Sequence, residues 1–113
     1  MAGIDTLAVP PGADVWYSDD FRNVLEDHMT LLRSNVGQYV RVEEFDLIKY
    51  QFDLYGLYRQ YQVAEEHLWP TMRLNGLSDP TSVPQDLQGF YTPNIQLLSQ
   101  ILNHYNTGNR TNR

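Results

Sequence analysis

Three histidines and several carboxylates are the side chains of this chain that could bind a metal or transfer protons. His67 directly follows Glu65 and Glu66, and metal sites and general bases both use imidazoles together with carboxylates. A metal site needs further ligands nearby, whereas His28 and His104 are expected on separate helices and no His-Glu-x-x-His pattern occurs. The sequence therefore predicts that His67 is a structural residue and that the chain has no metal site.

Nucleophilic and phosphate-binding chemistry has equally little support. None of the five serines stands in a Gly-x-Ser-x-Gly turn, and no glycine-rich phosphate loop occurs. Glu43 and Glu44 are neighbours in sequence, so their side chains diverge and cannot share a proton as a catalytic pair does. We therefore expect a protein that is not an enzyme, with no cofactor and no small-molecule substrate.

Length, composition and charge favour one acidic globular domain. The chain has 113 residues, of which 42% are hydrophobic and 19% charged, and it has no cysteine, which excludes disulfides and thiolate metal ligands. Its formal charge is −6, and residues 1–105 carry −8 because the tail beyond them holds two arginines and no acid. Such a body repels phosphate backbones, so no nucleic-acid partner is expected. No run of eighteen apolar residues occurs, so no membrane partner is expected either.

Residues 1–17 are expected to form an extended arm. Pro10, Pro11 and Gly12 exclude regular structure, while the residues around them are too apolar for a solvated segment. Such an arm has to lie on a surface, which is either its own domain or a neighbouring subunit. The arm residues expected to bind a partner are Val15, Trp16 and Tyr17.

Two amphipathic helices are predicted, one after the arm and one near the end of the chain. Ser18 is a suitable N-cap for a helix from residue 19 to about 34, in which apolar residues repeat at helical spacing. Thr92 is expected to cap a last helix from residue 93 to about 105. Residues 106–113 are expected to be a flexible tail.

Short strands and helices are predicted between them. Residues 39–42 and 87–91 have strand character, the second broken by a glycine. Helical periodicity begins at Glu43, is interrupted by Gly56 and resumes for one or two turns over residues 57–61. The chain is therefore expected to be mainly α, in a small α+β fold.

The segment around Trp69 carries the clearest local signals. Pro70 follows it, and proline is tolerated in the first turn of a helix, so a short helix should begin near Leu68 or Trp69. Asn75-Gly76 supplies a left-handed C-cap and Asp79-Pro80 a second turn. A helix this short depends on burial of its tryptophan. The expected structural anchors are Trp69, Pro70, Asn75, Gly76, Asp79 and Pro80.

Tyrosines recur at helical spacing along one flank. Tyr55, Tyr58 and Tyr61 are separated by three residues each, which places them side by side on a helix. Tyrosine is enriched at interfaces because it buries area while keeping a hydroxyl for a partner. One or two of the three could instead fill the core. We assign the triplet to a partner-binding surface.

A family resemblance rests on short motifs within residues 39–93, namely Asp46-Leu47-Ile48, Tyr55-Gly56, Trp69, Asn75-Gly76-Leu77-Ser78-Asp79-Pro80 and Phe90-Tyr91-Thr92-Pro93. In this order they resemble LysM-like modules. They also resemble baseplate wedge and tail proteins of contractile-tail bacteriophages, in which an aromatic-rich helix runs into an Asn-Gly-apolar turn. The resemblance implies a LysM-like strand-helix-helix-strand core in a single domain over residues 18–105, flanked by an N-terminal and a C-terminal helix.

Two positions depart from the LysM pattern. Residues 43–46, Glu-Glu-Phe-Asp, stand where LysM modules usually have Gly-Asp-Ser/Thr, and residues 84–86, Pro-Gln-Asp, lack the glycine of Pro-Gly-Gln. These positions help to build the glycan groove of peptidoglycan-binding members. The departures therefore affect sugar binding more than the fold.

The resemblance implies a non-enzymatic structural subunit of a phage virion, in the baseplate or tail. Its partners would be other tail or baseplate proteins, with several copies in each particle, and its location would be the virion after assembly in the host cytoplasm. The alternative is a LysM-like module that binds peptidoglycan or another glycan.

Overall fold

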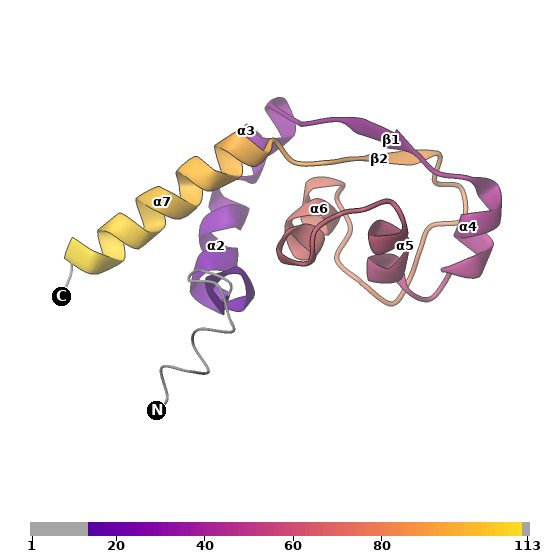
Figure 1. Ribbon diagram of the computed structural model, residues 1–113, viewed down its shortest axis with the longest axis horizontal. Coiled ribbons are helices and arrows are strands. Elements are labelled where there is room, and N and C mark those ends of the chain that lie inside the picture. Colours follow the sequence, from indigo (N-terminus) through magenta and orange to yellow (C-terminus); the bar gives the residue numbers. More distant parts are fainter. Residues whose placement is uncertain (1–13, 112–113) are drawn as a thin grey trace.

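The computed structural model describes residues 14–111, which form a mainly helical fold with one small antiparallel sheet (Figure 1). This arrangement confirms the expected mainly α, small α+β class. The elements follow in the order η1 (Asp14–Tyr17), α2 (Asp19–Asp27), α3 (Met29–Ser34), β1 (Tyr39–Arg41), α4 (Glu44–Lys49), α5 (Leu54–Gln60), η2 (Glu65–His67), α6 (Leu68–Leu74), β2 (Gly89–Tyr91) and α7 (Ile95–Thr111).

Strands β1 and β2 pair in antiparallel register, with Val40 opposite Phe90 and Tyr39 opposite Tyr91. Phe90 is buried and its ring lies 4.7 Å from the ring of Tyr58, so this face of the sheet covers the helices between the strands. Tyr39 and Tyr91 are exposed on the other face, with ring centroids 4.9 Å apart. Alternation along each strand thus produces one packed face and one open face.

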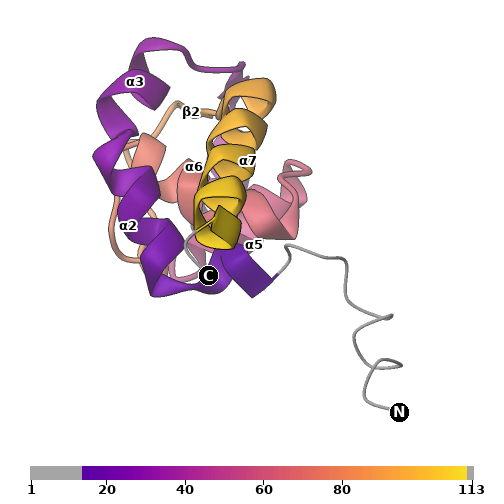
Figure 2. The same cartoon turned by 90° about the vertical axis from the view of Figure 1, so that its left-hand side faces the viewer.

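Two clusters of buried side chains form the core. The first joins η1, α2, α3 and α7, which lie together at one side of the molecule (Figure 2), to the end of α6. It consists of Trp16, Phe21, Leu25, Met29, Leu32, Leu74, Leu98 and Ile101. The second joins the sheet to α4, α5 and α6 and consists of Leu47, Leu54, Leu57, Tyr58, Leu68, Met72, Val83 and Phe90.

Helix α6 connects the two clusters. Leu74 belongs to the first cluster, Leu68 and Met72 belong to the second, and half-buried Trp69 packs against both. The prediction that a short helix begins near Trp69 is therefore confirmed. Its burial is shared among several side chains rather than provided by one tryptophan.

The end of α6 follows the predicted turn chemistry. Gly76 has φ +78°, its N–H donates to Arg73 O, and Leu77 N donates to Met72 O, which together make a Schellman motif. Asn75 accepts a hydrogen bond from Tyr91 N and donates one to Tyr91 O, both at 2.8 Å. The Asn-Gly pair therefore ends the helix and also ties it to β2.

The Asp-Pro turn is fixed in a similar way. Asp79 Oδ1 accepts hydrogen bonds from both the N–H and the hydroxyl of Thr81, and these bonds lower the pKa of the Asp79 carboxyl. Pro80 O accepts from Leu54 N at the start of α5. The turn therefore satisfies a donor at a helix N-terminus that has no partner within its own helix.

The first predicted helix is divided. Ser18 caps it as expected, because its Oγ accepts from Phe21 N, but α2 ends at Asp27 and α3 begins at Met29. His28 Nδ1 lies 2.8 Å from Val24 O, which its own main-chain N–H also contacts at 3.2 Å. A side chain that binds the carbonyl four residues back competes with the helical hydrogen bond and favours a bend there.

Gly56 does not interrupt a helix, contrary to the prediction. It lies inside α5, where its N–H donates to Oδ1 of the N-capping Asp53 at 2.9 Å. A Cβ on residue 56 would collide with this carboxylate, so glycine permits the close cap. The real interruption comes earlier, at the turn after Lys49, which separates α4 from α5.

Both ends of the domain also differ from the predictions. Residues 14–17 of the predicted arm form η1 and belong to the domain, while residues 1–13 lie outside the described residues. Asn94 Oδ1, rather than Thr92, accepts from Leu97 N at the start of α7. The predicted tail from 106 is helical to Thr111, and residues 112–113 are not described.

No helix in the described range is long and apolar enough to cross a bilayer.

Candidate interaction surfaces

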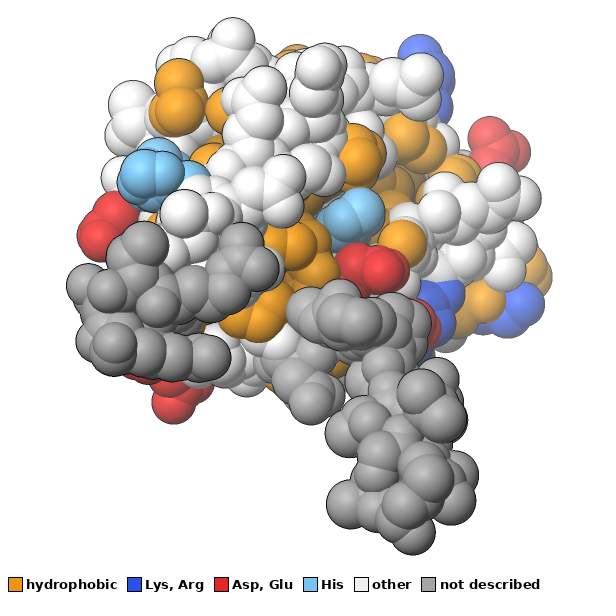
Figure 3. All heavy atoms as spheres, turned by 60° about the vertical axis from the view of Figure 1, so that its left-hand side comes forward, with side chains coloured by type: hydrophobic (Ala, Val, Ile, Leu, Met, Phe, Trp, Pro, Cys, Tyr) orange, Lys and Arg blue, Asp and Glu red, His pale blue; other side chains and the backbone are white. Residues whose placement is uncertain are grey.

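His67 and Glu65, which were considered for metal binding or proton transfer, make packing and ion-pair contacts in the structure. His67 is half-buried with its ring 5.3 Å from that of Trp16, and burial lowers the pKa of its imidazole. Glu65 pairs with Arg59. On the face around α7, acidic side chains are few and separated (Figure 3). No group of three or more His, Cys, Asp or Glu side chains in the described residues could hold a metal ion.

The predicted partner-binding residues of the arm separate into core and surface. Trp16 is only 8% exposed and packs edge-on against Phe21 with ring centroids 5.1 Å apart, so its assignment to a partner surface is wrong. Val15 is half-buried against the same cluster. Tyr17 remains exposed. The apolar arm residues nearest the domain therefore lie on their own chain.

The tyrosine triplet separates in the same way. Tyr58 is fully buried against Phe90, so it is not available to a partner, and burial raises the pKa of its hydroxyl. Tyr61 donates to Asp46 Oδ2 at 2.6 Å and accepts from Glu43 N at 2.8 Å. Desolvation and the hydrogen bond to Asp46 raise the pKa of Tyr61. This hydroxyl therefore links the end of α5 to the start of α4.

Four residues that the sequence singled out do meet. Trp16, Tyr17, Tyr55 and Trp69 line a cavity of about 90 Å³ where η1 packs against α5 and α6. The guanidinium of Arg22 lies 5.1 Å from the centre of the Trp69 ring. Burial raises the pKa of Tyr55 here. At this cavity η1 packs against α5 and α6 of its own chain.

The most exposed hydrophobic side chains lie elsewhere, on α4 and the turn after it. Phe45 is 71% exposed, Ile48 62% and Phe52 75%. The i, i+3 spacing of Phe45 and Ile48 places these two on one side of α4, while Leu47 faces the core and Phe52 follows in the turn after the helix. We call these three residues the α4 stripe. Helix α4 lies at the end of the molecule opposite α7 (Figure 1).

Sequence reasoning missed the stripe because its spacing is also that of a buried helix face. The signal that could have found it is that α4 carries apolar residues on two sides, with Leu47 between Phe45 and Ile48 in sequence. A helix of six residues at the edge of a small domain can bury only one side.

Comparisons with protein-family models, curated proteins and solved structures returned no match.

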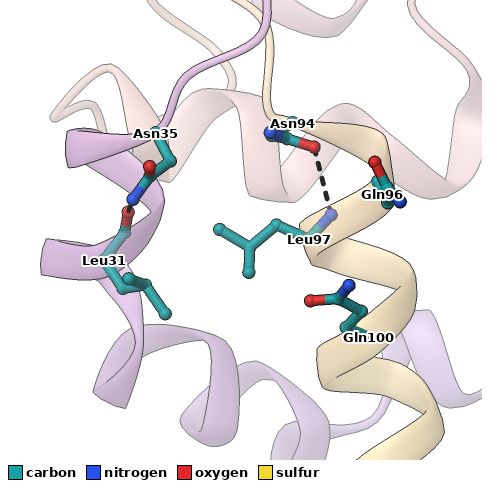
Figure 4. Close-up of a pocket in the computed structure, with 6 residues that line it drawn as sticks. All are labelled: Leu31, Asn35, Asn94, Gln96, Leu97 and Gln100. Atoms are coloured by element: carbon teal, nitrogen blue, oxygen red, sulfur yellow. Dashed lines mark hydrogen bonds between the residues drawn. The ribbon is translucent and has the colours of Figure 1, made fainter.

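A second surface feature is a cleft of about 260 Å³ between α3 and the start of α7 (Figure 4). Leu31 and Leu97 project into it from opposite sides, and Gln100 extends its amide toward it. The cleft and the α4 stripe lie toward opposite ends of the long axis of the molecule (Figure 1). The complete lining is Leu31, Asn35, Asn94, Gln96, Leu97 and Gln100.

Proposed function

We propose that the chain is a non-enzymatic structural subunit of a bacteriophage virion, in the baseplate or tail, that assembles through the α4 stripe. The observation that carries the proposal is the exposure of Phe45, Ile48 and Phe52 on a short peripheral helix and the turn that follows it. Contiguous exposed hydrophobic side chains mark contact sites on soluble proteins. Aromatic side chains are also enriched in the interfaces of stable assemblies.

The phage assignment is supported by the motifs that the chain shares with such proteins and by the arrangement around them. The Asn75-Gly76-Leu77 turn ends an aromatic-containing helix, and the following Asp79-Pro80 turn docks on α5. A LysM-like core would consist of β1, β2 and the helices between them. This chain has α4, α5, η2 and α6 there, which is more than the two helices of the expected core.

The stripe also suggests how a partner would be oriented. Exposed Glu44 and Lys49 stand on either side of it by helical periodicity. A matching partner presents an apolar ridge with a basic side chain toward Glu44 and an acidic one toward Lys49. Such rim charges contribute register and association rate more than affinity.

Particle assembly tests the proposal. The double variant Phe45→Gln/Phe52→Gln removes most of the stripe while keeping exposed side chains of comparable length. Tagged chains supplied during infection should be found in purified tails for the wild type and lost for the double variant. Ile95→Gln, at another exposed hydrophobic residue, is the matched control and should be incorporated normally. Wild-type protein that is absent from tails would contradict the proposal.

A second candidate function, glycan binding by a LysM-like module, is favoured by one groove. It has a volume of about 390 Å³ and lies between the end of β1, the start of α4 and residues 85–88 before β2. Its polar lining includes Arg41, Glu44 and Asp86. Calorimetric titration with N-acetylglucosamine oligomers distinguishes this candidate, since an absence of binding heat at millimolar sugar removes it.

A further inference from the structure

The Asn-Gly pair at the end of α6 has a chemical reactivity as well as a structural role. Of the eight asparagines in the chain, only Asn75 precedes a glycine. In such a pair the main-chain nitrogen of glycine attacks the amide carbon of asparagine readily, because no glycine side chain shields it. Gly76 is exposed, and a Cβ built on it would have nothing within 4 Å, so water and hydroxide can reach this nitrogen. The pair therefore has the composition and the solvent access of a deamidation site.

Deamidation proceeds in two steps that need only water and hydroxide. The Gly76 nitrogen loses its proton to hydroxide and bonds to Cγ of Asn75, and the Cγ–Nδ2 bond breaks as ammonia leaves with a proton taken from water. The resulting five-membered imide takes up one water at either of its carbonyls. One opening gives aspartate, and the other gives isoaspartate, whose main chain runs through the side chain and is one carbon longer. Either product replaces a neutral amide with a carboxylate.

The main chain at the end of α6 holds this reaction off. Ring closure needs the Gly76 nitrogen and the Cβ of Asn75 on the same side of the Cα–C bond between them. Asn75 has ψ 10°, which turns that nitrogen away from the Asn75 side chain. The Gly76 N–H also donates to Arg73 O at 3.0 Å within the Schellman motif, so its proton is held. The helix end therefore has to open before the attack.

The side chain of Asn75 is held in place mainly by the neighbouring strand. Its Oδ1 accepts from Tyr91 N at 2.8 Å, and its Nδ2 donates to Tyr91 O at 2.8 Å and to Thr71 O at 2.7 Å. Three hydrogen bonds thus fix both the attacked group and the leaving group. Two of them come from β2, which passes close to α6 (Figure 1). Release of Tyr91 is therefore the opening that frees the amide for reaction.

The product of the reaction cannot restore this contact. Both side-chain oxygens of an ionised aspartate are acceptors only. The oxygen that replaces Nδ2 would face the carbonyl oxygens of Thr71 and Tyr91, which now accept from that nitrogen. The new carboxylate would also stand at the C-terminal end of α6, where the helix dipole disfavours negative charge. Isoaspartate adds its extra main-chain carbon at the same helix end.

We propose that Asn75 is a self-modification site, whose deamidation is held off by the contact between α6 and β2 and, once complete, releases that contact permanently. The Asn-Gly turn then acts as a one-way device, since a chain that opens here and reacts does not return to its starting structure. This site goes beyond the proposed virion function and does not depend on the α4 stripe.

Mass spectrometry of the purified protein measures the reaction. Samples are kept at mildly alkaline pH, either folded or unfolded in guanidinium chloride, and the peptide that contains residue 75 is followed with time. Deamidation at Asn75 should be at least about tenfold slower in the folded protein, because it requires local opening. Equal rates in the two states, or no deamidation in either, would overturn the inference.

Two substitutions at one position separate the contact with β2 from general stability. Tyr91→Pro removes the N–H that donates to Asn75, whereas Tyr91→Ala loses the same ring but keeps this donor. The folded proline variant should deamidate at least about threefold faster than the folded alanine variant. Equal rates would show that β2 does not control the reaction. Circular dichroism checks that both variants are folded, and if the proline variant is not, the comparison of folded with unfolded wild type decides.

The product mimic Asn75→Asp tests the release of β2. Hydrogen exchange of the Tyr91 N–H, followed by nitrogen-15 NMR, should be at least about threefold faster than in the wild type. Asn23→Asp adds the same charge at an exposed position of α2 and should leave this exchange unchanged. Exchange that stays at the wild-type rate in Asn75→Asp, or that rises equally in Asn23→Asp, would contradict the release.

Discussion

Helices α4 and α5 follow each other in sequence and are both rich in large apolar side chains, yet the protein uses them in opposite ways. Helix α5 buries Leu54, Leu57 and Tyr58 completely beneath the sheet. Helix α4 buries only Leu47, and the α4 stripe on this helix and the following turn is left in water. The difference shows that helical spacing of apolar residues indicates an apolar helix face. It does not indicate whether the domain core or a partner covers that face.

The cause of the difference is the position of each helix in the fold. Helix α5 is held by the Asp79–Pro80 turn at its N-terminus, and the ring of Phe90 on β2 packs against its Tyr58. Helix α4 lies at the end of the molecule (Figure 1), where Leu47 packs into the second core cluster and Phe45 and Ile48 remain mostly exposed. The apolar side chains of α5 therefore stabilise the fold, and those of the α4 stripe are available to a partner.

The largest contrast is expected from truncating one side chain in α5 and one in the α4 stripe. Leu57→Ala should lower the free energy of unfolding by about 2–5 kcal/mol, because it leaves a cavity in a closed core. Phe52→Ala in the α4 stripe should change it by less than about 0.5 kcal/mol, because this side chain is already in water. Urea unfolding followed by tryptophan fluorescence measures both. Similar losses for the two variants would show that the stripe is part of the core.

Gly56→Ala tests how tightly α5 is capped. The new Cβ collides with the Asp53 carboxylate, so we expect a loss of about 1–3 kcal/mol in unfolding free energy. In an Asp53→Ala background the closest contact of the new Cβ is gone, and the same substitution should cost less. A double-mutant cycle from urea unfolding measures this coupling. Additive effects would mean that the glycine is not required by the cap.

Tyr58→Phe tests the fully buried face of α5 more finely. The Tyr58 hydroxyl is buried and has no hydrogen-bond partner in the described structure, so its removal should leave stability unchanged or raise it by up to about 1 kcal/mol. Tyr61→Phe is the matched control, since its hydroxyl joins α5 to α4 through two hydrogen bonds and its loss should destabilise by about 1 kcal/mol. Thermal unfolding ranks the two variants. A destabilised Tyr58→Phe protein would reveal a hydroxyl partner.

The smallest expected effect is on the pH dependence of folding stability, and it should be independent of substitutions in the α4 stripe. A hydrogen bond from Arg73 lowers the pKa of Glu26 below its usual 4.5, so the pair stabilises the fold above about pH 4.5 and this contribution is lost as the pH falls through the native pKa. The pair is partly exposed, so the contribution should be below about 1 kcal/mol. Glu26→Gln should flatten the acid limb of stability measured between pH 2 and 6. Substitutions in the α4 stripe should leave that limb unchanged.

Local signals in the sequence predicted local structure well. Ser18 caps α2, Pro70 lies in the first turn of α6, and Gly76 adopts the left-handed conformation. These features depend on backbone chemistry within a few residues, which a sequence displays directly. The sequence also indicated the two short strands, because alternation and flanking turns are local as well.

Burial could not be predicted in the same way, because it depends on which segments meet. Trp16 and Tyr58 were expected at a partner surface and are core residues. Phe45 and Phe52 lie within the helical periodicity predicted from Glu43 onward, yet they are exposed. The most exposed large hydrophobic side chains lie on α4 and the turn after it rather than on the triplet of Tyr55, Tyr58 and Tyr61. The amides of the α3–α7 cleft come from segments about sixty residues apart, such as Asn35 and Asn94, so no sequence motif indicates them.

Hydroxyl-radical footprinting of the free protein and of purified virions tests the contrast between α4 and α5 most directly. In the free protein, Phe45 and Phe52 should be labelled strongly and Tyr58 weakly. In virions, the two phenylalanines should become protected while Tyr58 stays as weakly labelled as before. Phenylalanines that remain labelled in virions, or that are already protected in the free monomer, would contradict the assignment of the α4 stripe to a partner.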